Sequence, residues 1–169
     1  MLDGTFVLRP LAEADAADWL ELVTNPQVYG PTSWAVTELE VLRAASARHA
    51  AFGRRWAVVR AADGAFVGTC GAARVEAAGV EVAGEAEVAY ELHPADWGRG
   101  LATAAVRAYV EECATAGIPR LVAHTWVGNE PSRRVLERCG FTPEELLPAF
   151  RSCRGELRDF VRWGRRPDR

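Results

Sequence analysis

The chain has 169 residues, a formal net charge of -3, 49% hydrophobic residues and 25% charged residues. A chain of this length fits one domain with its own core, so we expect a single domain over residues 1–169 with a frayed tail at 164–169. Every basic side chain other than histidine is arginine, which excludes a lysine nucleophile, a lysine Schiff base and a Walker-type phosphate site. The lack of a long basic run argues against a nucleic-acid partner.

The pattern of apolar and turn residues predicts strands and helices along the whole chain. Pro10 ends the first strand, Asp63-Gly64 forms a hairpin turn, and Gly117 ends a helix. In chain order we expect a strand at 5–9, helices at 12–23 and 37–52, strands at 55–60, 66–75 and 88–92, a helix at 101–116, a strand at 120–127, a helix from 129 to about 139, and strands at 150–153 and 157–163, with residues 29–31 in a loop.

This order of elements predicts an α/β (α+β) fold. We expect a mixed, mostly antiparallel central sheet of about seven strands, with helices on both faces. The strands before and after the helix at 101–116 should be parallel and joined by a right-handed crossover.

Several kinds of site and location are disfavoured by what the sequence lacks. No apolar run approaches the length of a membrane span, and the first four residues do not resemble a signal peptide. The four cysteines are widely spaced, with no C-x-x-C, which indicates reduced thiols in a cytoplasmic protein and no metal site.

The stretch from Val88 to Thr103 combines a strand, a glycine turn and the start of a helix. Pro94 ends the strand, and Gly98 and Gly100 precede a run without glycine or proline. The first N–H groups of a helix lack internal partners and the helix dipole makes that end electropositive, so the turn is suited to a phosphate. A plain strand-to-helix turn that needs glycine for its backbone is the alternative.

Three motifs in this order resemble the GNAT acyltransferases. They are A-Y-E-L-H-P, D-W-G-R-G-L-A-T and N-E-P-S-R-R-V-L-E-R-C-G-F, and with F-V-L-R-P near the start and G-E-L-R-D-F near the end the resemblance covers nearly the whole chain. It is greatest to the RimJ/RimL branch, whose members acetylate the N-termini of ribosomal proteins. Ala104 departs from the branch, which often has Glu at that position.

The resemblance implies a GNAT fold with a V-shaped splay between the fourth and fifth strands, and acetyl-CoA as co-substrate without a metal. The pyrophosphate would lie at the glycine turn, and the pantetheine would run beside the end of the strand at 88–92, with an oxyanion-type N–H contact near Leu92. The residues implied to bind the co-substrate are Leu92, His93, Trp97, Gly98, Arg99, Gly100, Leu101, Ala102, Thr103, Asn129, Ser132 and Arg133.

The chemistry expected of such a protein is direct attack of a neutral amine on a thioester in a ternary complex, helped by a base and an acid. Glu87 and Glu91 lie four residues apart on one strand face, and the family places a base carboxylate on this strand, where Glu87 fits best. The alternative for both is a solvated strand carboxylate. Ser132 is the candidate acid for the leaving thiolate, and Asn129 either contacts the co-substrate or only caps its helix.

The acceptor is less defined than the donor. By the same resemblance, Tyr29 and Trp34 would form part of the acceptor wall, and the acceptor would be a peptide N-terminus or a small-molecule amine. Branch members often form dimers, so a homodimer is one of the assemblies that the resemblance allows. No nucleic-acid or membrane partner is expected. The competing function is a non-catalytic acyl-CoA sensor with the same fold, which has no need to keep the carboxylates, Asn129 and Ser132.

Overall fold

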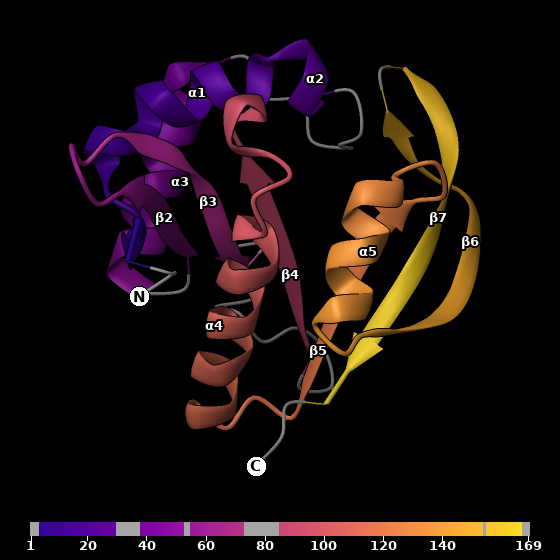
Figure 1. Ribbon diagram of the computed structural model, residues 1–169. Coiled ribbons are helices and arrows are strands. Elements are labelled where there is room, and N and C mark those ends of the chain that lie inside the picture. The colour runs from indigo at the N-terminus through magenta and orange to yellow at the C-terminus, as the bar shows by residue number, and fades with distance from the viewer. Residues whose placement is uncertain (1–3, 30–37, 53–54, 73–84, 154, 167–169) are drawn as a thin grey trace.

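The computed structural model describes residues 4–29, 38–52, 55–72, 85–153 and 155–166. One seven-stranded sheet has the order β1-β2-β3-β4-β5-β7-β6 (Figure 1). The elements are β1 (Phe6–Pro10), η1 (Glu13–Asp15), α1 (Ala16–Thr24), α2 (Pro26–Tyr29), α3 (Leu39–Phe52), β2 (Arg55–Arg60), β3 (Phe66–Ala72), β4 (Glu85–Leu92), η3 (Pro94–Asp96), α4 (Leu101–Thr115), β5 (Arg120–Trp126), α5 (Glu130–Arg138), β6 (Thr142–Cys153) and β7 (Glu156–Arg165).

The sheet divides between β4 and β5, the only parallel neighbours among the strands that the structure describes. These strands pair from Glu85 opposite Arg120 to Glu87 opposite Val122. Beyond that point β4 continues to Leu92 against β3, whereas β5 continues to Trp126 against β7. The predicted mixed sheet and the splay between the fourth and fifth strands are therefore confirmed, and the wide end of the gap lies beyond Glu87.

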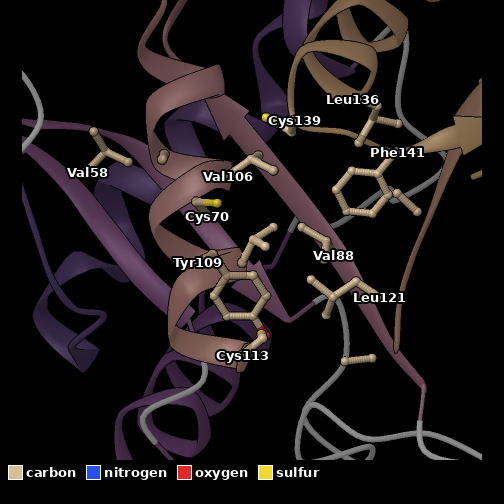
Figure 2. Packing of buried hydrophobic residues seen from close by; sticks show 14 of the residues in the cluster. Val58, Cys70, Val88, Val106, Tyr109, Cys113, Leu121, Leu136, Cys139 and Phe141 are labelled. Carbon is tan, nitrogen blue, oxygen red and sulfur yellow. The ribbon is translucent and has the colours of Figure 1, made fainter. Parts of the chain in front are cut away.

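Helices cover both faces of the sheet, as the element order predicts. On one face, α4 and α5 pack over the larger core, where Figure 2 shows Val106 and Tyr109 of α4 near Cys70 and Val88 of the sheet. On the other face, α1 and α3 cover a second core around Trp19, which is 1% exposed. Burying side chains of this size contributes about 1.5–3 kcal/mol each, and the larger core, which contains residues of β4, β5 and β7, joins the two parts of the divided sheet.

Several boundaries differ from the sequence prediction, among them that of β4, which begins at Glu85 instead of residue 88. Residues 26–29, expected to lie outside a helix, form the single turn α2. β6 begins at Thr142 instead of residue 150, because it is an edge strand with most side chains exposed and so lacks the apolar alternation that marks a strand. β7 continues to Arg165, so Gly164 and Arg165 pair with β5 and are not part of a frayed tail.

Candidate functional site

The end of β4 presents backbone groups to the gap in the sheet. His93 N donates to Val67 O of β3 at 2.7 Å, and Leu92 lies opposite Gly68. Successive residues of a strand direct their backbone N–H groups to opposite edges of that strand. Because His93 N bonds to β3, the N–H groups of Tyr90 and Leu92 point to the other edge, toward the side of β5. The carbonyl of Leu92 accepts a hydrogen bond from Trp97 Nε1 at 2.8 Å, which leaves its N–H as the group available to a ligand there.

The glycine turn leads into a helix whose N-terminus has no side-chain cap. Gly98 and Gly100 have φ of 76° and 80°, a region that only glycine adopts at little cost. The first bond of α4 runs from Ala104 N to Gly100 O at 3.0 Å, so the N–H groups of the three preceding residues lack an intrahelical acceptor. A Cβ on either glycine would have no neighbour within 4 Å, so space for a ligand adjoins these groups.

Two other residues of this turn, Arg99 and His93, have protein partners. Arg99 donates to Asp96 Oδ1 at 3.0 Å, and its guanidinium lies 5.4 Å from the centre of the Phe6 ring. His93 Nδ1 accepts from Ala95 N at 3.3 Å and so caps η3. These contacts fix the shape of the turn, and in them His93 behaves as a turn residue.

The N-terminus of α5 lies at the same end of the molecule as that of α4, where the gap widens (Figure 1). Asn129 caps α5 by accepting from Ser132 N at 3.2 Å. The hydroxyls of Ser132 and Tyr90 are 2.6 Å apart, which links α5 to β4 across the gap. Burial raises the pKa of Tyr90, so its phenol is neutral and has a proton to donate. The sequence analysis took Tyr90 only as a strand residue, and nothing in its alternating pattern distinguishes a hydroxyl at the gap from a core ring.

Arg133 is tied to its own helix. Its guanidinium pairs with Glu130 at 2.6 Å and Glu137 at 2.8 Å, and the side chain is 44% exposed. This is the pattern of a solvated helix charge, and its contact with the co-substrate stays a prediction.

Glu87 is buried and held by two basic groups from other strands. Its Oε1 lies 2.8 Å from His124 Nδ1 of β5 and 3.0 Å from Arg151 NH1 of β6, and the side chain is 8% exposed. Burial alone would raise the pKa of Glu87, but the hydrogen bond from His124 and the charge and hydrogen bond of Arg151 outweigh it and lower this pKa to about 2. Glu87 is therefore an ionised acceptor at neutral pH.

Glu91 belongs to a different cluster on the same strand face. Thr69 Oγ1 donates to Glu91 Oε2 at 2.6 Å, and the same carboxylate oxygen pairs with Arg55. Arg55 is 1% exposed, and its guanidinium lies 5.1 Å from the centre of the Trp19 ring. The two glutamates thus share a face as predicted, but their carboxylates have separate partners.

His124 and Arg151 are the site residues that the sequence analysis missed. From the sequence, His124 is only one residue of the strand expected at 120–127, and Arg151 lies in the part of β6 that follows an irregularity between Leu147 and the arginine itself. Phe150 contacts both residues. The ring centres of Phe150 and His124 are 5.2 Å apart, and the guanidinium of Arg151 lies 4.8 Å from the centre of the Phe150 ring. Only pairing across four strands brings them to Glu87, so no local pattern could have identified them.

The acceptor wall is the least described part of the site. Tyr29 is the last residue of α2 and its side chain lies outside the described residues, as does the whole of Trp34. Their roles stay predictions.

The cysteines take no part in this arrangement. Cys70, Cys113, Cys139 and Cys153 are free and buried, and burial raises the pKa of the Cys70 thiol. Within the described ranges, no three His, Cys, Asp or Glu side chains gather as a metal site would require. In the same ranges, no helix combines the length and apolar character needed to span a bilayer.

Comparison of the sequence with known proteins finds one family and a distant relative. Residues 5–142 match the model of the family described as "Acetyltransferase (GNAT) domain". The uncharacterized N-acetyltransferase p20 of Bacillus licheniformis is 28% identical over 106 residues, which are 62% of this chain and 57% of the relative. The matched part thus spans little more than half of that relative's length.

Solved structures share the fold over almost the whole chain. The spermidine N-acetyltransferase of Vibrio cholerae, solved with CoA and spermine, superposes with a TM-score of 0.82 at 19% identity over 96% of each chain. RimL, a ribosomal L7/L12 alpha-N-protein acetyltransferase solved with coenzyme A, gives a TM-score of 0.82 at 21% identity over 99% of this chain and 97% of that chain. At these identities the similarity concerns the fold.

Proposed function

The chain belongs to the GNAT acetyltransferase family, and from that membership we propose that it transfers the acetyl group of acetyl-CoA to a primary amine, either a protein N-terminus or a small molecule. The observation that carries this proposal is the uncapped N-terminus of α4 at the wide end of the gap between β4 and β5. Its free N–H groups suit a pyrophosphate, and the split sheet leaves strand-edge N–H groups beside it.

The residues present fit acetyl-CoA. The pyrophosphate would accept from the N–H groups of Gly98 to Thr103, where an added Cβ at Gly98 or Gly100 meets nothing. The pantetheine would lie along the free edge of β4, within reach of the Leu92 N–H. When bound, acetyl-CoA supplies a thioester whose carbonyl carbon forms the new C–N bond while the C–S bond breaks and the thiolate leaves with the electron pair.

The leaving thiolate needs a proton, and we assign its donation to Ser132. Ser132 Oγ lies 2.6 Å from Tyr90 OH, so a proton given up by the serine is replaced from the tyrosine along one hydrogen bond. Tyr90 carries its proton at neutral pH, because burial raises its pKa, and it takes up a proton again from solvent after each turnover.

We assign to Glu87 a part in removing the other proton, the one that the attacking amine must lose. An alkylamine with pKa near 10 is neutral in roughly one molecule in a thousand at pH 7, so a proton acceptor near the nitrogen is worth about 10²–10⁴-fold in rate. Glu87 contributes its fixed negative charge at the parting of β4 and β5.

The acceptor classes come from the structural neighbours. The proteins of similar fold act on spermidine in one case and on a protein α-amine in the other. An α-amine with pKa near 8 costs only about 1.4 kcal/mol to deprotonate at pH 7, against about 4 kcal/mol for an alkylamine. We therefore expect the higher kcat/KM with a peptide N-terminus.

The proposal is tested by acetyl-CoA binding and by thiol release. Isothermal titration should show that Gly100→Val weakens acetyl-CoA binding at least tenfold, whereas Gly64→Val, a substitution at another exposed turn glycine with φ of 73°, leaves binding unchanged. Free thiol should form when acetyl-CoA is mixed with spermidine or with an Ala-initiated peptide. Binding without thiol release from any amine of a broad panel would favour the acyl-CoA sensor, and unchanged affinity of Gly100→Val would overturn the glycine-turn assignment.

A further inference from the structure

The contact between Glu87 and His124 determines which nitrogen of the imidazole has a proton. Glu87 Oε1 lies 2.8 Å from His124 Nδ1 and also accepts from Arg151 NH1 at 3.0 Å. An ionised carboxylate accepts hydrogen bonds and donates none, so Nδ1 must be the donor. In the neutral ring, the lone pair is then on Nε2.

His124 lies where a substrate amine would approach. It is two residues beyond Val122, the last β5 residue that pairs with β4, and so belongs to the part of β5 that has separated from β4. Among the residues that the structure describes, none makes a hydrogen bond to Nε2. The ring is 11% exposed and packs on Phe150, which is itself 41% exposed.

We propose that His124 Nε2 accepts the proton of the attacking amine, and that Glu87 is a positioning residue that holds the imidazole through Nδ1. This inference rests on the proposed function and names its base. The amine nitrogen uses its electron pair for the C–N bond, its proton passes to Nε2, and His124 returns that proton to solvent after each turnover.

The charges around His124 fit this role better than direct catalysis by Glu87. A carboxylate with a pKa of about 2 is a weak proton acceptor at neutral pH, whereas imidazole is the side chain whose ordinary titration range lies there. From β6, Arg151 balances the charge of Glu87. From β7, Arg162 lies opposite His124 in register, and its guanidinium is paired with Glu85 and Glu144 at 2.6 and 2.7 Å.

The kinetic test compares His124→Gln and Glu87→Gln with the wild type in the thiol-release assay, using an Ala-initiated peptide or spermidine, whichever the wild type prefers. His124→Gln should lower kcat about 10²–10⁴-fold and keep the acetyl-CoA affinity. Its kcat/KM should follow only the ionisation of the amine, so its pH profile should differ from that of the wild type. Glu156→Gln, at an exposed carboxylate that pairs with Arg158, is the matched control and should match the wild type.

A second readout does not depend on turnover. Long-range ¹H–¹⁵N spectra of the wild type, with His124 assigned by its loss in His124→Gln, should show the neutral ring protonated at Nδ1, and Glu87→Gln should abolish this preference. A neutral ring protonated at Nε2 in the wild type would overturn the inference, as would wild-type activity and pH profile in His124→Gln. If the wild type acetylates no amine, the proposed function fails instead, and the spectra still test the positioning by Glu87.

Discussion

The Glu91→Gln variant should unfold more readily than the wild type, although Glu91 lies on the strand where a catalytic carboxylate was expected. Its ion pair with Arg55 is buried, with side chains 8% and 2% exposed, and Thr69 hydrogen-bonds both partners. Gln keeps the size and an accepting oxygen but removes the negative charge that pairs with the Arg55 guanidinium in the interior. Breaking a buried pair from one side costs about 3–5 kcal/mol.

Thermal unfolding measures this loss directly. Unfolding entropies of about 2.1 cal/mol/K per residue give roughly 0.35 kcal/mol/K for a chain of this length, so the melting temperature should fall by about 8–14 °C. Glu40→Gln is the matched control, because Glu40 pairs with Arg43 at the surface with 78% of its side chain exposed and should lower stability by at most about 1 kcal/mol. The double replacement Arg55→Met with Glu91→Met removes both charges and should recover much of the loss.

The opposite result would make Glu91 a candidate for the catalytic base. If Glu91→Gln melts within about 2 °C of the wild type, the shift expected for a surface pair, the cluster is not a structural ion pair. A large fall in thiol release without a fall in stability would then identify Glu91 as the base.

Three further predictions concern residues of β3 and β4. The pKa of Glu87 falls from 4.5 to about 2 on folding, so its ionised form stabilises the protein fully above pH 4.5 and this stabilisation is lost as the pH falls toward 2. The urea unfolding midpoints of the wild type and Glu87→Gln should therefore converge over that range. A difference between the midpoints that stays constant with pH would contradict the pairing. Gly68→Ala should lower the melting temperature, since its Cβ would lie 2.1 Å from a β4 carbonyl oxygen, whereas Gly64→Ala has no such neighbour. Tyr90→Phe should slow thiol release with little change in acetyl-CoA affinity, and an unchanged rate would exclude proton supply through Ser132.

The local features of the co-substrate site could be predicted from sequence because they involve neighbouring residues. A strand ended by Pro94, glycines at positions of positive φ and an uncapped helix start all follow from backbone preferences within a dozen residues. The same holds for Asn129, whose capping of α5 is a local interaction.

The roles of the carboxylates could not be predicted in this way. Glu87 and Glu91 are equivalent by period, yet one faces a histidine and an arginine from β5 and β6, and the other faces a threonine and an arginine from β3 and β2. Those partners are separated from them by 22 to 64 positions in the chain. The edge strand β6, which supplies Arg151, has too few buried side chains to show a strand pattern before residue 150.

The sequence by itself thus determined the order of the elements, the glycine turn and the start of α5, because propensity, turn chemistry and capping act over a few residues. Only the tertiary structure decided that β4 and β5 separate beyond Glu87, that Tyr90 meets Ser132 across the gap, and that Glu87 orients His124 while Glu91 holds Arg55. The physical reason is that burial and the charge of partners distant in sequence set the state of an ionisable group, and both exist only once the strands are paired.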